Sequence, residues 1–354
     1  MSVPPAAIER ARELLYGAAR PLVIHDNDPD GVVSFCLVHR ICGDARSVAF
    51  KNKPAIDGSF LARVEEHAPD LVVILDTSRV TEEFLGALRT PVLWIDHHEP
   101  PQDLLARFPG VHYVNPRVWD DTDNRPTSYW MYQIAQANIW LATVGCVADW
   151  YMPDFLPAFR QRYADLLPED VVTIERAYLE TKVGTLVRVI QFNLKGTTSD
   201  VRKSVMTLAR IDSPYEILLE STAGGRLLWR RYQRLIAGYD ALLKDALAAR
   251  PDGIVHLFAY AGGEQTYTAE LSNELLIRFP DRIILIARSH DGKRKCSIRS
   301  RGIELPPIIA ESLRGCEGHG GGHANACGTV VREEDWERFY ARFRELAAGG
   351  PLRA

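Results

Sequence analysis

The sequence predicts an α/β protein with an N-terminal parallel sheet, a helical connector and a smaller C-terminal α/β domain. Three observations support this fold class. Short apolar runs alternate with helical segments over the first part of the chain, and several of these runs end in acidic or histidine-bearing loops. Residues 150–250 are polar and helical in pattern, and strand-like runs return from Gly253 onward. We therefore expect three parts, residues 1–150, 151–250 and 251–354.

In the N-terminal part, apolar runs predict the strands and amphipathic runs predict the helices. Strands are expected at 21–24, 46–50, 71–75, 91–95 and 111–116, and helices at 6–18, 32–41, 58–68, 81–89, from about 127, and at 137–149. The helix at 137–149 is almost entirely apolar and ends in Asp149. A buried carboxylate at that position needs a partner for its charge.

The rest of the chain changes from helical to mixed character. Helices are expected at 155–166, 171–194, 201–210 and 226–249. Beyond them we expect strands at 254–260, 282–287 and 293–301 and helices at 268–278, 307–314 and 332–347. A glycine-rich segment, residues 318–328, lies between the last two of these helices.

Composition excludes several classes of protein. The chain has 354 residues and six cysteines without CxxC spacing, so we expect neither a disulfide framework nor a zinc knuckle. Its formal net charge of −4 argues against a generally positive surface that would bind polyanions without selectivity. The N-terminus lacks the order of a signal peptide, and no apolar run is long enough to span a bilayer. These features predict a soluble cytoplasmic protein with no membrane partner.

Four segments of the first half carry residues that bind divalent cations. The candidates are His25, Asp28, Asp30, Asp76, His97, His98 and Asp149. Because the carboxyl ends of parallel strands meet at one edge of a sheet, we expect these side chains to converge. Carboxylates and imidazoles without thiolates favour Mn²⁺ or Mg²⁺ over structural zinc. Seven candidates exceed the needs of one ion, whereas two ions sharing a carboxylate would use them and would promote displacement at phosphorus. Any one of these acids, taken alone, is better explained as a cap or turn residue.

Several motifs, in order, resemble those of the DHH phosphoesterase family. The N-terminal motifs are Asp-Pro-Asp-Gly (28–31), Asp76, Asp96-His97-His98 and Asp149. Gly-Gly-Gly-His (320–323), preceded by Ser-Ile-Arg-Ser-Arg (297–301), is similar to the C-terminal domain associated with that family. The resemblance covers nearly the whole chain, and residues 150–250 are its least diagnostic part.

The resemblance implies roles for the individual residues. A first metal would be held by His25, Asp28 and Asp76, and a second by Asp30, Asp76, His97 and Asp149. Asp76 would bridge the two metals, His98 would face the scissile phosphate, and Asp96 would orient a neighbouring histidine, so that His98, Asp76 and Asp96 form the catalytic group. Asp26 is a rival for the place of His25.

The glycine-rich segment has a physical role of its own. Glycines let backbone N–H groups approach a phosphate closely and form an anion-binding concavity. His323 would add a side-chain donor, and Arg299 from the preceding basic strand would bind the same phosphate. The expected substrate-binding residues are Arg299, Ser300, Gly321, Gly322 and His323. Without the metal motifs, residues 318–328 would be interpreted as a flexible loop.

Together these features predict a phosphodiesterase with two divalent cations, manganese first and magnesium as the alternative. Its substrate would be short or single-stranded RNA or DNA, cut exonucleolytically, with the two domains facing one another across a cleft. A cyclic or linear dinucleotide is the alternative substrate. A non-catalytic replication or repair scaffold is a further alternative, although such a protein is expected to lose metal ligands that are present here. The direction of digestion and a homodimeric assembly are left open.

Overall fold

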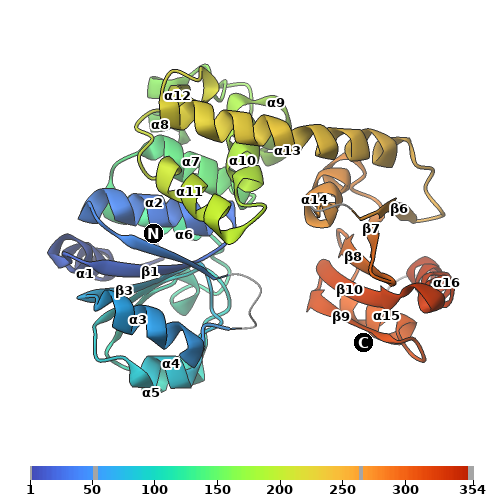
Figure 1. Ribbon diagram of the computed structural model, residues 1–354, viewed down its shortest axis with the longest axis horizontal. Helices are drawn as coiled ribbons and strands as arrows, with labels where there is room; N and C mark the ends of the chain where they lie inside the picture. The colour runs from blue at the N-terminus through green and yellow to red at the C-terminus, as the bar shows by residue number, and fades with distance from the viewer. Residues whose placement is uncertain (1, 51–54, 263–265, 350–354) are drawn as a thin grey trace. The chain divides into compact units, whose positions relative to one another are not determined.

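A computed structural model of the chain describes residues 2–50, 55–262 and 266–349. It divides into two compact units, Met1–Gln233 and Arg234–Ala354 (Figure 1). In the described residues each unit contains one five-stranded sheet. The long helix α13 (Ala223–Ala248) begins in the first unit and ends in the second. The mixed α/β class is therefore confirmed, and the three-part division with its boundaries stays a prediction.

The sheet of the first unit is parallel throughout, as predicted. Its strands are β1 (Pro21–Asp26), β2 (Arg46–Phe50), β3 (Leu71–Leu75), β4 (Val92–Ile95) and β5 (Val111–Val114), in the order β2-β1-β3-β4-β5. The residues of β3 and β4 are all buried, as expected for strands covered on both faces. The carboxyl ends of β1, β3 and β4 consequently lie side by side at one edge.

Helices cover both faces of this sheet (Figure 1). On one face lie α1 (Pro5–Gly17), α2 (Pro29–Cys42) and α6 (Thr127–Ala135). On the other lie α3 (Leu61–His67), which follows the short helix η1 (Gly58–Phe60), then α4 (Glu82–Ala87) and α5 (Gln102–Arg107). The second face forms an apolar core in which Trp94 of β4 packs among the helix residues Phe60, Phe84 and Leu104. This core fixes the strands that carry the site.

Further helices pack against the helices that cover the first face of the sheet. They are α7 (Ile139–Ala148), α8 (Leu156–Tyr163), α9 (Ile174–Glu180), α10 (Lys182–Asn193), α11 (Thr198–Leu208) and α12 (Pro214–Leu218), and α7 contacts α2, α6 and α10. The prediction of one helix over 171–194 is wrong. The chain breaks at Thr181, whose side chain caps α10, and a Cβ on Gly184 would lie 1.9 Å from the carbonyl oxygen of Tyr178. The glycine allows the two helices to meet at this break.

The second unit contains a mixed sheet in the order β6-β7-β8-β10-β9. Its strands are β6 (Val255–Ala261), β7 (Ile283–His290), β8 (Lys293–Arg299), β9 (Gly318–His323) and β10 (Ala326–Arg332); β6 and β7 are parallel and the other pairs are antiparallel. Helices α15 (Leu305–Ser312) and α16 (Trp336–Ala348) share a core with one face, and α14 (Thr268–Arg278) packs against β7 and β8. The glycine-rich segment, for which no strand was predicted, contains β9 and most of the hairpin that β9 forms with β10.

Short 3₁₀ helices, η2 (Pro116–Val118) and η3 (Glu333–Asp335), complete the described elements. Among the residues that the structure describes, none of the helices combines the length and apolar character required to cross a bilayer. The cytoplasmic location expected from the sequence stays a prediction.

Candidate functional site

The first acidic residues of the site lie where β1 passes into α2. The Asp28 carboxylate caps this helix by accepting a hydrogen bond from the Gly31 N–H at 2.9 Å. A Cβ on Gly31 would lie 2.7 Å from the carbonyl oxygen of Asp26 and 3.2 Å from Oδ2 of Asp76. Glycine at this position therefore lets the helix begin directly against the two neighbouring strand ends.

Asp30 joins the start of α2 to the start of α6. Its two carboxylate oxygens accept hydrogen bonds from the backbone N–H groups of Thr127 and Ser128, each at 2.9 Å. The positive end of a helix dipole stabilises a carboxylate in this position. The sequence analysis placed a helix start near these two residues but gave them no role. The backbone N–H groups of Thr127 and Ser128 hold Asp30, a predicted metal ligand, in a buried position.

Asp76 follows β3 and has an unusual backbone conformation. Its φ is +62°, in the left-handed region that non-glycine residues seldom adopt. One of its oxygens, Oδ1, accepts a hydrogen bond from the Thr127 hydroxyl at 3.1 Å and lies 3.5 Å from Nε2 of His97. The strained backbone turns a buried carboxylate toward the other acids, and such strain is concentrated at functional sites.

Asp149 enters from α7, as its C-terminal cap. Gly145, one turn earlier, allows α7 to approach α2 and α6, since a Cβ there would lie 2.6 Å from the Ser128 hydroxyl and 3.1 Å from Val33. The Asp149 carboxylate then lies 3.6 Å from Nε2 of His97. The negative end of a helix dipole disfavours a carboxylate, so this side chain requires a cationic partner.

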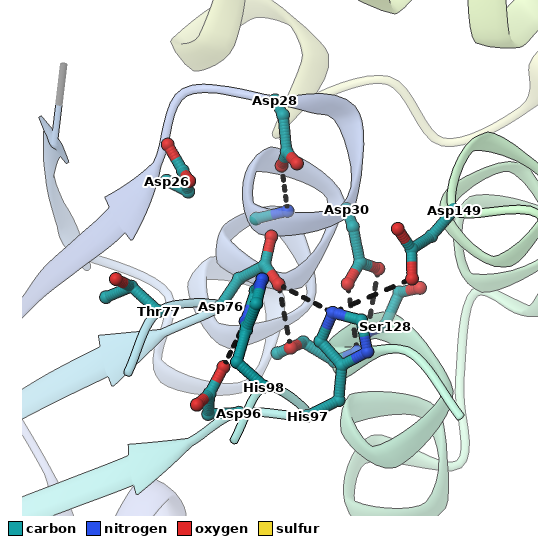
Figure 2. Close-up of polar contacts among 12 residues, drawn as sticks. Asp26, Asp28, Asp30, Asp76, Thr77, Asp96, His97, His98, Ser128 and Asp149 are labelled. Atoms are coloured by element: carbon teal, nitrogen blue, oxygen red, sulfur yellow. Dashed lines mark hydrogen bonds and ion pairs between the residues drawn. The ribbon is translucent and has the colours of Figure 1, made fainter. Parts of the chain in front are cut away.

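These segments converge on one site (Figure 2). Ligand atoms of Asp30, His97 and Asp149 lie within 4.8 Å of one another, and so do those of Asp76, His97 and His98. In Figure 2 the side chains of Asp30, Asp76 and Asp149 lie next to His97, and the side chain of Asp28 lies farther away at the start of α2. Clustered carboxylates and imidazoles are the donor set of hard divalent cations, so these residues fit a metal centre.

His25 does not join this cluster, and the expectation that it binds the first metal is corrected. Its Nδ1 is 2.7 Å from the Asp26 carbonyl oxygen and its Nε2 is 2.7 Å from the Ser47 hydroxyl on β2. The ring is fully buried and stacks on Phe35 at 5.3 Å. Successive side chains of a strand point to opposite faces, so a shift of one residue decides which side chain reaches the site. Asp26, the rival for this place, lies near enough to Asp28 for its charge to help raise the pKa of that carboxyl.

His98 is held by a buried polar network. Its Nδ1 lies 2.8 Å from Oδ1 of Asp96, which is fully buried at the end of β4. The other oxygen of Asp96 accepts from the Tyr113 hydroxyl at 3.3 Å and from the Asn115 amide at 3.5 Å, and that amide also donates to the His98 carbonyl at 2.9 Å. Sequence reasoning missed Tyr113 and Asn115; their position at the end of β5 was the available signal.

The titration of the cluster reflects its burial. Burial, then the charge of Asp149, raises the pKa of Asp30 to about 7, and burial likewise raises the pKa of Asp149 to about 7. Burial and the charge of Asp76 raise the pKa of Asp28 well above its usual range. Burial opposes protonation of His97, but its hydrogen bond to Asp76 and the charge of Asp149 raise its pKa well above the usual value. Without a bound cation, the positive charge of His97 is too small to balance the negative charges of the carboxylates around it.

We expect the metal-free protein to lose stability between pH 6.5 and 8. In this range folded Asp30 and Asp149 release protons that the unfolded chain released near pH 4, so the folded state binds more protons and its stability falls as pH rises. Each carboxylate contributes a loss of about 1 kcal/mol. His97, with its raised pKa, acts in the same direction. His25, whose burial lowers its pKa to about 4, acts only below pH 6.5.

Thermal unfolding in EDTA and in excess Mn²⁺ at pH 6.5, 7.2 and 8.0 measures this effect. The Tm should fall with pH in EDTA and rise with pH in Mn²⁺, because protons compete with the metal for the same oxygens. Asp30→Asn should reduce the fall. The same pH dependence with and without Mn²⁺ would contradict the assignment of these carboxylates as ligands.

Two of the five predicted substrate-binding residues, Gly321 and Arg299, lie on one face of the sheet of the second unit. Ser297, Gly328 and Gly321 lie directly opposite one another on β8, β10 and β9. A Cβ on Gly321 would meet nothing within 4 Å, and one on Gly328 would come no closer than 3.7 Å to Cys296. Because directly paired residues point to the same face, this row forms an open surface, which we call the glycine platform.

Arg299 borders the glycine platform on β8. It lies two residues from Ser297, so both side chains point to the same face. Its Nε donates to the Asn273 side chain of α14 at 2.8 Å, and its Nη1 donates to the carbonyl of Ile298 at 3.0 Å. Burial lowers the pKa of this guanidinium. The side chain is therefore held in place at the edge of the platform.

Three other predicted substrate residues stand differently. The Ser300 hydroxyl is buried and donates to the Ile303 carbonyl at 2.6 Å, so it stabilises the turn after β8 rather than facing the platform. Gly322 has φ +148°, and a Cβ there would lie 2.4 Å from the Ala326 carbonyl, so the hairpin itself requires this glycine. The side chain of His323 lies outside the described part of the structure.

Comparison with known proteins bears on both units. Residues 253–349 match the family model of the DHHA1 domain. The C-terminal unit therefore contains a segment that is similar to the DHHA1 domain. The whole chain also has the fold of RecJ from Thermus thermophilus, solved with Mn²⁺: the TM-score is 0.66 at 18% identity, and the match covers 99% of this chain and 56% of RecJ. The chain thus spans little more than half the length of that protein.

Two further structures share the fold. An exonuclease RecJ bound to manganese matches with a TM-score of 0.61 at 18% identity, covering 99% of this chain and 97% of the other. PggH, a pGpG-specific phosphodiesterase from Vibrio cholerae, matches with a TM-score of 0.53 at 13% identity, covering 94% and 100%. No curated protein matches the sequence. The predicted resemblance to DHH-family proteins with a DHHA1 domain is confirmed, with identities that establish the fold.

Proposed function

We propose that this DHHA1 protein is a metal-dependent phosphodiesterase that hydrolyses short or single-stranded nucleic acid exonucleolytically. The observation that carries the proposal is the convergence of Asp30, Asp76, His97 and Asp149, from four separate segments, into two candidate ligand groups that share His97. A coincidence of caps and turn residues does not account for it, since Asp76 has a strained backbone. The RecJ structures with manganese have the same fold.

The residues divide between two ligand sets. Asp26, Asp28 and Asp76 would hold the first cation, with Asp26 in place of His25. Asp30, Asp76, His97 and Asp149 would hold the second. The two cations, Mn²⁺ first and Mg²⁺ as the alternative, would supply Lewis-acid charge and activation of water for attack at phosphorus. The protein supplies the fixed positions of the carboxylates, through the backbone donors of α6 and the cap of α2.

His98 would act on the leaving group. The Asp96 carboxylate accepts a hydrogen bond from Nδ1–H and so fixes the ring orientation, which leaves Nε2 for the scissile phosphate. The charge and hydrogen bond of Asp96 raise the pKa of His98 against the opposing effect of burial. A protonated imidazole in this position can donate a proton to the departing oxygen.

The DHHA1 domain would bind the substrate at the glycine platform. A surface without side chains accepts a flat base or a phosphate closely, and Arg299 at its edge can pair with a phosphate. A single small platform on a chain with net charge −4 suits short or single-stranded substrates better than long duplexes, which require many phosphate contacts.

Gly321→Val should block the glycine platform without unfolding the domain. The new side chain enters open space on a strand, where valine is well tolerated. We expect KM for a short oligonucleotide to rise about tenfold or more, with kcat and Tm little changed, because one to two kcal/mol of binding contacts are lost. Steady-state kinetics and thermal unfolding measure both effects. Gly322→Ala is the matched variant: it should lower Tm, because its Cβ meets the Ala326 carbonyl. An unchanged KM in Gly321→Val would remove the platform from the substrate site.

A second candidate function is hydrolysis of cyclic or linear dinucleotides, which the shared fold with PggH favours. Product time courses with Mn²⁺ on 5′- and 3′-labelled 2-mers, 5-mers and 20-mers, and on cyclic dinucleotides, separate the two functions and reveal the direction of digestion. We expect stepwise release of mononucleotides from short single strands. Activity confined to dinucleotides would support the second candidate. Absence of turnover on every substrate would favour a non-catalytic scaffold.

A further inference from the structure

The turn after Asp76 presents an arginine that the motifs do not include. Hydrogen bonds hold the backbone of Arg79 on both sides of its Cα atom. Its N–H donates to the Thr77 hydroxyl at 3.2 Å, and its carbonyl accepts from the Ile56 N–H at 2.8 Å. The Thr77 carbonyl in turn accepts the Trp94 indole N–H at 2.8 Å. The backbone that carries this arginine is therefore tied to the core beneath the metal-ligand cluster.

The side chain of Arg79 extends toward Asp26, the last residue of β1. Its guanidinium lies over the Phe50 ring, 5.2 Å from the centroid, at the end of β2. Its Nη2 is 3.9 Å from Oδ2 of Asp26, which is too long for a hydrogen bond. Among the described residues this is its one ion-pair contact, and the side chain is 58% exposed. A guanidinium stacked on a ring keeps its N–H donors available at its edge.

We propose that Arg79 is a catalytic residue that binds the non-bridging oxygens of the substrate phosphodiester at the metal-ligand cluster. The inference rests on the proposed function. The five clustered carboxylates carry one more negative charge than two divalent cations neutralise, so an anionic substrate meets repulsion that an arginine at their border reduces. The planar fork of a guanidinium matches two phosphate oxygens, and its placement on Phe50 limits the entropy lost on binding.

Two simpler roles for Arg79 predict different behaviour. If Arg79 served to neutralise Asp26, its removal would change the affinity for Mn²⁺. If it served to cover Phe50, its removal would lower stability with no effect on substrate charge recognition. If Arg79 instead binds the substrate phosphate, its removal should weaken binding of a charged linkage more than binding of an uncharged one. The test therefore compares charged and uncharged linkages of the same shape.

The experiment measures binding of two dinucleotide analogues that cannot be hydrolysed, in the presence of Mn²⁺. In one, both bridging oxygens are CH₂ groups, giving a phosphinate that keeps the negative charge; in the other, the phosphorus group is replaced by an uncharged sulfone. Calorimetry with wild type, Arg79→Ala, Arg79→Lys and Arg10→Ala gives each affinity. Arg10 is the matched control, with the same 58% exposure on α1.

We expect Arg79→Ala to weaken phosphinate binding about tenfold and sulfone binding less than twofold, with Arg79→Lys between wild type and alanine. Affinity for Mn²⁺ alone and the Arg10→Ala values should match wild type. Equal losses for both analogues, or a loss of Mn²⁺ affinity, would overturn the proposal. If wild type cleaves oligonucleotides and Arg79→Ala cleaves them equally well, the Arg79 assignment fails while the proposed function stands. If wild type cleaves none, the proposed function itself fails.

Discussion

Replacing Asp76 with asparagine should reduce kcat on a short oligonucleotide by about a thousandfold or more, since this carboxylate is proposed to serve both cations. Asparagine has the same shape and tolerates the left-handed backbone found at this position, where φ is +62°. The fold should therefore be kept, and the lost charge alone should account for the effect. Single-turnover kinetics with Mn²⁺ measure the rate of the chemical step, and calorimetric titration measures the affinity of the variant for Mn²⁺.

The control for this variant is Asp103→Asn, at an exposed position in the first turn of α5. It should match wild type in turnover and in Mn²⁺ affinity. In EDTA at pH 8, Asp76→Asn should be at least as stable as wild type, because one buried charge has been removed. An Asp76→Asn enzyme with normal turnover would contradict the bridging role of this carboxylate.

The second large effect is expected for His98→Gln. Loss of a general acid lowers kcat by about a hundredfold to a thousandfold. The effect should depend on the leaving group: an oligonucleotide leaves as an alkoxide that needs a proton, whereas p-nitrophenolate does not. We therefore expect His98→Gln to cleave a p-nitrophenyl nucleotide ester nearly as well as wild type.

Asp96→Asn completes this comparison. An asparagine would no longer accept the His98 proton as a carboxylate does, so the imidazole would lose its fixed orientation. Its kcat should fall on oligonucleotides, with Mn²⁺ affinity unchanged. If His98→Gln were equally impaired on both leaving groups, His98 would have a role other than proton donation.

Sequence reasoning predicted the convergence of the metal-ligand residues because it follows from topology. Asp76 and Asp96 each follow a buried parallel strand, and such strand ends meet at one edge of the sheet. Asp149 was predicted because a buried helix ending in a charge requires a partner. The prediction that His25 binds a metal was wrong for a local reason. His25 and Asp26 are adjacent on β1 and point to opposite faces, and the sequence alone did not show which of them faces the site.

Other features depend on contacts between distant segments. No strand was predicted over residues 318–323, and glycine is unfavourable in a strand, yet pairing with β10 makes this segment a strand of the sheet that carries the glycine platform. Tyr113 and Asn115 join the site through contacts with Asp96 across neighbouring strands. Such contacts follow from the register of the sheet, and a sequence pattern does not specify that register.

The most direct test of the metal centre is anomalous diffraction from crystals of the protein grown with Mn²⁺. We predict two manganese peaks about 4 Å apart. Asp76 should contact both, Asp30, His97 and Asp149 should surround one, and His25 should touch neither. A single peak, peaks away from Asp76, or no peak at saturating Mn²⁺ would contradict the account.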